Sequence, residues 1–209
     1  MELKEIIDGI RRTLDEADSA REEALRLTRE VVRLSGDAVK AIHRNDLETA
    51  RQRLKSAQQL VEMIRESLKP YPMLYYSGYV QSAHQEFVEA TLLLAYREGR
   101  EFPSPPWDLG VPEADYLLGL GDFVGELRRH FLLLLIDGKV EEAEEVYRFM
   151  EELYGELMTL EYPPKGLVNI RTKQDQARHI LERTLEDLTR AKLNKRLEEK
   201  LKAAVGGDE

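Results

Sequence analysis

The first 44 residues constrain the fold most, because they form one amphipathic pattern that no proline interrupts. At about 100° per residue, one side of a helix over this stretch collects apolar residues, namely Leu27, Val31, Leu34, Ala38 and Ile42. The opposite side collects basic residues, namely Arg26, Arg29, Arg33, Lys40 and Arg44. The pattern predicts a single long helix over residues 2–44 that buries its apolar face. The basic stripe is either a solvated face or a surface that follows phosphates.

The rest of the chain repeats the helical pattern in segments bounded by proline, glycine or asparagine. No run of alternating or β-branched residues predicts a strand. Further helices are expected over residues 47–68, 77–98, 112–136, 140–160 and 169–193, with 195–205 as a short seventh helix or a continuation of the sixth. We therefore predict an all-α bundle of six or seven helices, several of them long. It forms a single domain over residues 1–209, with 203–209 as a frayed tail.

The composition excludes several classes of protein. The chain has no cysteine, so it can hold neither disulfides nor thiolate-bound metals. No apolar run approaches the roughly 20 residues of a membrane-spanning helix, and the N-terminus lacks the apolar core of a signal peptide. We expect a cytoplasmic protein that has no membrane partner.

The segment DYLLGLGDFVGELRRH, residues 115–130, is unusual for a helix because it carries Gly119, Gly121 and Gly125. Each glycine in a helix interior costs about 1 kcal/mol relative to alanine. A helix that accepts three of them is expected to be approached closely by another backbone or by a ligand.

Two pairs of carboxylates stand at helical spacing. Asp122 and Glu126 are four residues apart on the glycine-bearing segment, and Glu86 and Glu89 are three apart in HQEFVEA. Like charges at this spacing repel, so a positive group is expected beside them. Carboxylate oxygens suit Mg²⁺, with Mn²⁺ as an alternative. Alternatively, the two carboxylate pairs belong to solvent-exposed helix faces of an acidic protein and bind no metal.

The distribution of charge agrees with a cation near these pairs. The net charge is −9, and residues 86–161 alone hold 18 acidic and 6 basic side chains. A bound cation would relieve the repulsion in this region. The exposed face of EEAEEVYRFMEE can also account for much of the excess.

Known catalytic motifs are absent from the chain. It contains no Gly-rich phosphate loop, no GxSxG and no HExxH, and it lacks the Glu-x-x-His pairs of di-iron bundles. Mg²⁺ held by carboxylates can activate water and stabilise a phosphoryl transition state. With a basic helix nearby, the residues favour hydrolysis of a phosphodiester or a nucleotide.

The segment DYLLGLGDFVGELRR resembles the signature of the translin family, especially its catalytic branch, translin-associated factor X (Trax). Three further segments look similar to the family, so that the resemblance covers about residues 15–190: REEALRLTREVVRLSGDAVKAIHR, YSGYVQSAHQEFVEATLLLAY and YPPKGLVNIRTKQDQARHILERTLEDL. The resemblance implies a seven-helix protein that assembles into a hollow octamer. For the Trax branch it implies a Mg²⁺-dependent endoribonuclease that acts on single-stranded RNA inside the shell.

The resemblance also implies roles for individual residues. The family's catalytic acids match the positions that the spacing singles out, namely Glu86, Glu89, Asp122 and Glu126. Translin proper has basic and aromatic residues where Gln85 and Glu86 stand, so this chain looks like the catalytic type. His84 stands where translin's RNA-contacting segment carries a histidine, which implies an RNA contact, although the flanking arginines of that segment are absent.

Several arginines could bind the phosphates of a nucleic acid. The candidate phosphate contacts are Arg26, Arg29, Arg33 and Arg129. The favoured function is a homo-octameric endoribonuclease for single-stranded RNA, with single-stranded DNA as an alternative ligand. One competitor is a non-catalytic shell that binds single-stranded RNA or DNA. The other is an all-α nucleoside triphosphate pyrophosphohydrolase, whose usual ExxE and ExxD pairs differ from the DxxxE found here.

Overall fold

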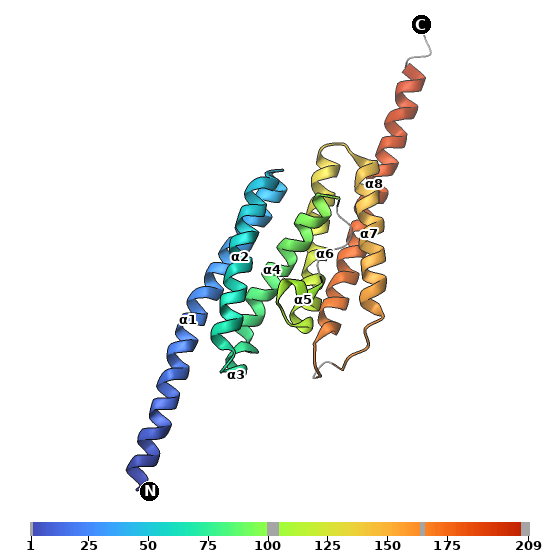
Figure 1. Ribbon diagram of the computed structural model, residues 1–209. Helices are drawn as coiled ribbons and strands as arrows, with labels where there is room; N and C mark the ends of the chain where they lie inside the picture. The colour runs from blue at the N-terminus through green and yellow to red at the C-terminus, as the bar shows by residue number, and fades with distance from the viewer. Residues whose placement is uncertain (1, 100–104, 164–165, 206–209) are drawn as a thin grey trace. The chain divides into compact units, whose positions relative to one another are not determined.

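The computed structural model describes residues 2–99, 105–163 and 166–205, and in these residues it contains α-helices and no strand (Figure 1). The helices are α1 (Leu3–His43), α2 (Leu47–Leu68), α3 (Pro72–Tyr75), α4 (Gly78–Arg97), α5 (Pro106–Leu109), α6 (Glu113–Ile136), α7 (Val140–Met158) and α8 (Ile170–Val205). The predicted all-α class is confirmed. None of the helices in the described ranges combines the length and the apolar character that crossing a membrane requires.

The six long helices match the predicted ranges closely, and the differences lie in short or terminal segments. Residues 195–205 continue α8 and do not form a separate helix. The predicted frayed tail is therefore helical as far as Val205, and residues 206–209 lie outside the described part. The four-residue helices α3 and α5 were not predicted, because one turn is too short to show a periodic pattern. Both carry a proline at their start, where its missing N–H is not needed.

The chain divides into two compact units, residues 1–120 and 121–209, called unit 1 and unit 2 below. The boundary falls inside α6, so that this helix contributes its first part to unit 1 and its second part to unit 2. A single domain over residues 1–209 stays a prediction.

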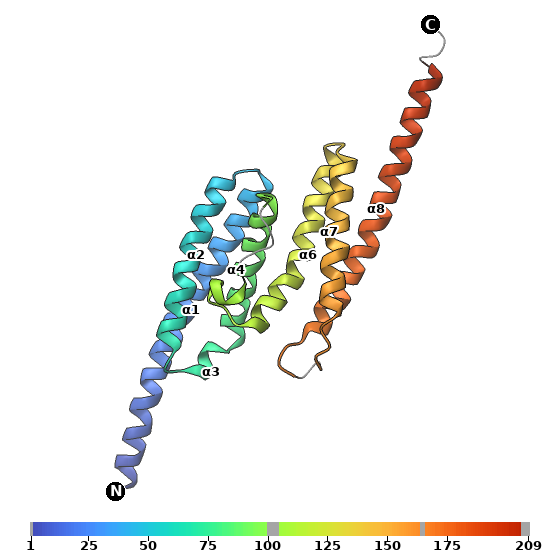
Figure 2. The same ribbon diagram turned by 45° about the vertical axis from the view of Figure 1, so that its right-hand side comes forward.

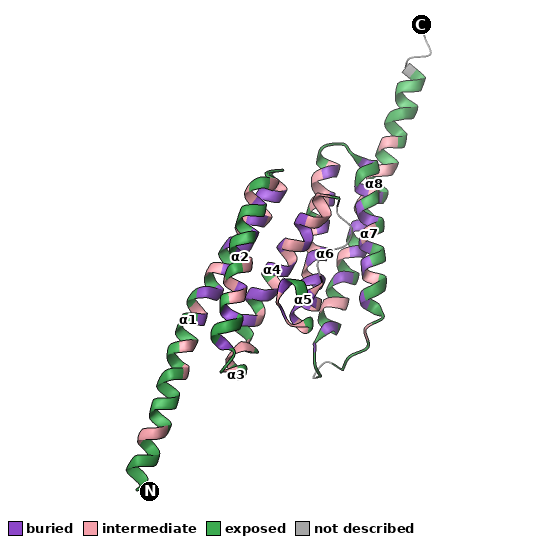
Figure 3. Cartoon of the chain, in the orientation of Figure 1, coloured by how far each residue is buried: buried purple, intermediate pink, exposed green. Residues whose placement is uncertain are grey.

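Unit 1 is organised around α1, which packs against α2 and α4. The predicted apolar face of α1 is confirmed, since its residues are buried, as the purple stretches in Figure 3 show: Leu27, Val31, Leu34, Ala38 and Ile42. The break between α1 and α2 is set locally, because the Asp46 carboxylate accepts a hydrogen bond from the Thr49 N–H at 3.1 Å and caps α2.

Unit 2 consists of the second part of α6 together with α7 and α8, which lie side by side in Figures 1 and 2. The Gln174 side chain of α8 donates to the carbonyl oxygens of Leu157 and Leu160 at 2.7 and 3.0 Å, which satisfies the end of α7. Lys192 pairs with Glu144 at 2.6 Å near the start of α7. These contacts fix α8 along α7 and thereby position its side chains toward α6.

Candidate active site

Gly119 of α6 allows a close approach between two helices of unit 1. A Cβ atom at this position would lie 2.8 Å from the carbonyl oxygen of Gln85 and 2.8 Å from the Cβ of Val88, both on α4. The expected approach of another backbone is confirmed here. Only glycine permits this distance without movement of α4.

Gly121 serves a different neighbour, the side chain of Lys173 on α8. A Cβ at Gly121 would lie 2.6 Å from the Cβ and 2.9 Å from the Cγ of Lys173, so the lysine stem crosses α6 where a side chain is missing. From there the ammonium Nζ reaches the Asp122 Oδ1 at 2.5 Å. The positive group that we expected beside the Asp122 and Glu126 pair is therefore Lys173. Sequence reasoning missed it because it lies 51 residues away.

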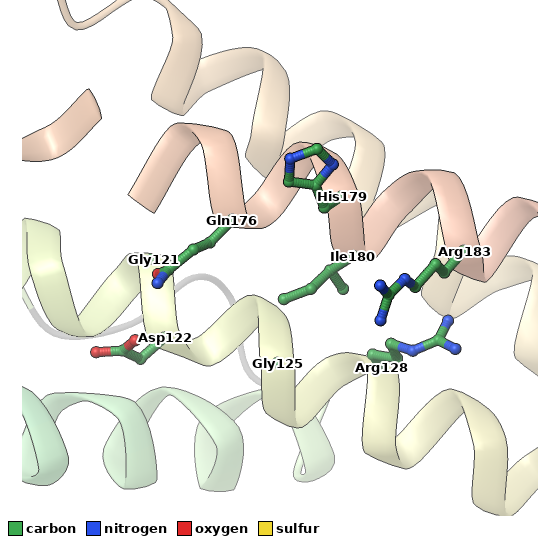
Figure 4. Close-up of a pocket in the computed structure, with 8 residues that line it drawn as sticks. All are labelled: Gly121, Asp122, Gly125, Arg128, Gln176, His179, Ile180 and Arg183. Carbon is green, nitrogen blue, oxygen red and sulfur yellow. The ribbon is translucent and has the colours of Figure 1, made fainter. Parts of the chain in front are cut away.

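Gly125 has no atom within 4 Å of the place where its Cβ would stand, so packing does not require a glycine there. It opens instead onto a pocket of about 470 Å³ between α6 and α8 of unit 2 (Figure 4). From α6 the pocket is lined by Gly121, Asp122, Gly125 and Arg128. From α8 it is lined by Gln176, His179, Ile180 and Arg183.

Two arginines face this pocket, one from each helix. The Arg128 guanidinium is held in place, since it donates to the Thr184 Oγ1 and to an Asp187 carboxylate oxygen, both at 2.8 Å. Arg183 is exposed, and across the described ranges no hydrogen bond or ion pair of its guanidinium is found. Figure 4 shows the Arg183 side chain directed toward Arg128. Neither arginine was singled out from the sequence, although Arg128 lies in the glycine-bearing segment 115–130.

The remaining carboxylates lie as the helical spacing requires. Glu126 is on α6, with its side chain 20% exposed and 3.9 Å from Arg129. Glu86 is exposed and Glu89 half-buried on α4 of unit 1. Over residues 2–99, 105–163 and 166–205, no three His, Asp or Glu side chains gather into a group that could hold a metal ion. Metal binding by these acids stays a prediction.

The donor chemistry nevertheless fits a hard divalent cation. All four predicted ligands are carboxylates, which Mg²⁺ prefers over nitrogen or sulfur ligands. Asp122 already holds a cationic group, the Lys173 ammonium, so its carboxylate is placed to bind positive charge.

His84, the predicted RNA contact on α4, lies inside unit 1. Its side chain is fully buried in unit 1, and Nδ1 lies 2.7 Å from Asp115 Oδ2. The other Asp115 oxygen accepts from Gln81 at 3.0 Å, and the Tyr75 ring meets the imidazole edge-on at 5.6 Å. Burial, together with the Asp115 charge, raises the pKa of Tyr75 to about 12. His84 thus belongs to a buried polar cluster in this chain, and its contact with RNA stays a prediction.

The basic stripe of α1 is partly neutralised by acids of the same helix. Arg26 pairs with Glu23 at 2.6 Å, and Arg33 pairs with Glu30 at 2.5 Å. The hydrogen bonds from the arginines lower the pKa values of Glu23 and Glu30. Arg29 is exposed and makes no ion pair within the described part of the chain. The stripe therefore offers less free positive charge than its composition suggests.

Comparison with known proteins shows similarity over nearly the whole chain. The sequence model described as "Translin family" matches residues 4–188. An uncharacterized protein of Methanocaldococcus jannaschii is 36% identical over 186 residues, which cover 88% of this chain and 82% of the relative.

Solved structures show the same similarity in three dimensions. The structure of AfC3PO in complex with duplex RNA is 36% identical and has a TM-score of 0.82, covering 90% of this chain and 97% of that one. The structure of apo-NeC3PO is 27% identical with a TM-score of 0.80, covering 88% and 96%.

Proposed function

Because the chain belongs to the translin family, we propose that it binds RNA and cleaves it as a Mg²⁺-dependent endoribonuclease of the Trax-like branch. The observation that carries the proposal is the place of Asp122, which lines the same pocket as Arg128 and Arg183. An acid for cation binding and guanidinium groups for phosphate are the parts that phosphodiester hydrolysis needs. AfC3PO, a similar protein, was solved with duplex RNA.

The proposed Mg²⁺ ligands are the two carboxylate pairs, namely Glu86, Glu89, Asp122 and Glu126. They supply oxygen ligands for one or two ions, and Mn²⁺ is an alternative. When bound, such an ion supplies Lewis-acid stabilisation of the phosphoryl oxygens and lowers the pKa of water.

The chain's own residues provide orientation and proton transfer. Lys173 fixes one oxygen of Asp122, which leaves the second oxygen for other partners. Glu126 or Glu89 accepts the proton of the attacking water as general base. The water oxygen forms a bond to phosphorus, the bond from phosphorus to one ribose oxygen breaks, and that oxygen takes up a proton from a solvent water as it leaves.

We further propose that the protein works as a hollow homo-octamer with single-stranded RNA inside, and that single-stranded DNA is an alternative ligand. Support comes from the translin-like sequence signature and from the fold shared with AfC3PO. Gln85 and Glu86 stand where translin proper has basic and aromatic residues, which favours the catalytic branch.

A second candidate is an RNA-binding shell without catalysis. The contact between Lys173 and Asp122 favours it, because a carboxylate that is satisfied by lysine can serve a purely structural purpose. In that case Glu86, Glu89 and Glu126 do not share a metal-binding role.

The decisive experiment incubates the purified protein with labelled single-stranded RNA and, separately, duplex RNA. Each substrate is tested with Mg²⁺, Mn²⁺ or EDTA, beside a Glu126→Gln variant. Cleavage that requires the metal and disappears in the variant supports the nuclease. Tight binding without cleavage in every condition favours the shell, and release of pyrophosphate from free nucleotides would favour the pyrophosphohydrolase.

A further inference from the structure

The pocket between α6 and α8 brings two guanidinium groups to one cavity, and this arrangement is unfavourable unless something negative joins them. Arg128 uses two of its five N–H donors, toward Thr184 and Asp187. Its other donors and all those of Arg183 stay available to a ligand. Two like charges that face one cavity repel, and an anion between them converts the repulsion into two attractions.

The local charge balance leaves this end of the pocket positive. Asp187 offsets Arg128, and Lys173 offsets Asp122. The imidazole of His179, which lines the pocket, lies 3.5 Å from a carboxylate oxygen of Glu182. Arg183 adds a positive charge that no described acid pairs with.

The shape and lining suit a phosphodiester with its sugar. A volume of about 470 Å³ lies within the roughly 300–1,000 Å³ of small-ligand pockets. Guanidinium forks match phosphate oxygens in pairs. Gln176 adds an amide, and Ile180 offers apolar surface beside the charged groups, as Figure 4 shows.

The spacing of Arg128 and Asp122 along α6 shows how far Arg128 lies from the proposed cleavage site. Arg128 follows Asp122 by six residues, which is about 9 Å along a helix axis. Gly125 lies between them, and the missing side chain leaves the pocket floor open. A strand whose cleaved phosphate lies at Asp122 would therefore bring a neighbouring phosphate to the two arginines.

From these contacts we infer that the α6–α8 pocket is a phosphate-binding subsite for the RNA backbone, in which Arg128 and Arg183 hold a phosphodiester adjacent to the one that is cleaved. The inference rests on the proposed function and specifies where the strand lies. Arg183 is the adaptable contact, and Arg128 is the preorganised one, because Thr184 and Asp187 hold it in place.

The test measures binding of a fluorescent single-stranded oligoribonucleotide in EDTA, so that cleavage plays no part. Arg183→Gln is compared with Arg190→Gln, which removes the same charge from an exposed position of α8 outside the pocket. We expect Arg183→Gln to weaken binding about 10-fold, and to reduce the slope of log K against log salt by about 0.7, the value for one phosphate contact on a single strand. Arg190→Gln is expected to change binding less than about twofold.

The outcomes separate this inference from the proposed function. If wild-type protein binds RNA and the two variants weaken it equally, the pocket is not a subsite, while the nuclease proposal stands. If Arg183→Gln abolishes the binding of orthophosphate or AMP to the protein but leaves RNA binding unchanged, the pocket takes small phosphates and the inference is wrong. If wild-type protein binds no RNA, both proposals fail together. Circular dichroism of both variants confirms folding.

Discussion

Lys173 reaches Asp122 by lying across the backbone of α6 at Gly121, so that a residue without a side chain positions an ion pair. The Nζ to Oδ1 distance is 2.5 Å, and the lysine side chain is 17% exposed against 32% for the aspartate. One carboxylate oxygen is therefore oriented by a fixed cation. A carboxylate that is held in this way loses less freedom when it binds a further partner.

Replacing Lys173 by methionine keeps the stem over Gly121 and removes the charge. We expect cleavage of RNA to fall about 10- to 100-fold, the usual effect of losing a group that orients a metal ligand. RNA binding in EDTA should change less than about twofold, because Lys173 does not line the pocket. Single-turnover cleavage and fluorescence anisotropy measure the two quantities.

The matched control is Lys192→Met, which breaks a similar ion pair with Glu144 elsewhere on α8. Equal loss of activity in both variants would show a general effect on α8 and would contradict a positioning role for Lys173. Unchanged cleavage in Lys173→Met would contradict it as well.

Gly121→Ala should lower RNA cleavage in the same way as Lys173→Met, but without removing any charge. The new methyl group would lie 2.6 Å from the Lys173 Cβ, so the lysine stem must shift, and we expect this shift to weaken the contact between its ammonium and Asp122. The double variant Gly121→Ala/Lys173→Met should cleave no more slowly than the slower single variant, because both act through one contact. Additive losses in the double-mutant cycle would refute this shared route.

Gly125→Ala should make the protein more stable while it weakens RNA binding. Nothing lies within 4 Å of the new methyl group, so the helix gains about 1 kcal/mol of propensity. For a chain of this size we expect the Tm to rise by about 2–4 °C. The methyl group narrows the pocket floor, so anisotropy should show weaker RNA binding.

Gly155→Ala on α7 is the control for this prediction, since it also has open space around it and lies outside the pocket. It should raise the Tm to a similar extent and leave RNA binding unchanged. Weaker binding in both variants would show that the pocket is not involved.

Gly119→Ala should have the opposite effect on stability, although it lies on the same helix. Its methyl group would stand 2.8 Å from the Gln85 carbonyl oxygen, and a backbone atom cannot turn away as a side chain can. Overpacking of this kind costs about 1–3 kcal/mol, which exceeds the gain in helix propensity. Thermal unfolding beside Gly125→Ala measures the difference, and a rise in Tm for Gly119→Ala would contradict the close packing of α4.

The six long helices and the carboxylate pairs were predictable because both depend on local spacing. The apolar face of α1, with residues such as Val31 and Ile42, recurs at the helical period, and burial follows from it. Prolines mark the starts of α3 and α5, but one turn gives no period to read. The glycines of α6 predicted that another group approaches the helix closely, but not that α4 does so at Gly119, Lys173 at Gly121 and no group at Gly125.

Contacts between distant residues could not be predicted in this way. Lys173 and Asp122 are separated by 51 residues. Arg128 and Arg183 lie in segments that resemble the translin family, but nothing in those segments indicates that the two arginines face one pocket. The burial of His84 could not be predicted for a related reason. The sequence alone does not show whether a helical histidine faces solvent or a buried acid, and its partner Asp115 lies 31 residues away.

The buried cluster of His84 gives the last prediction, which concerns stability. Asp115→Ala removes the partner of His84 Nδ1 and of the Gln81 amide, and both are left with a missing hydrogen bond. Loss of one partner from a buried pair costs about 3 kcal/mol, so the Tm should fall by roughly 10 °C.

Asp108→Ala, at an exposed position of α5, should leave the Tm unchanged. RNA binding per folded molecule should be the same in Asp115→Ala, Asp108→Ala and the wild type when it is measured well below the Tm. Weaker binding at an unchanged Tm in Asp115→Ala would support the predicted RNA contact of His84 and would show that this part of unit 1 opens to receive RNA.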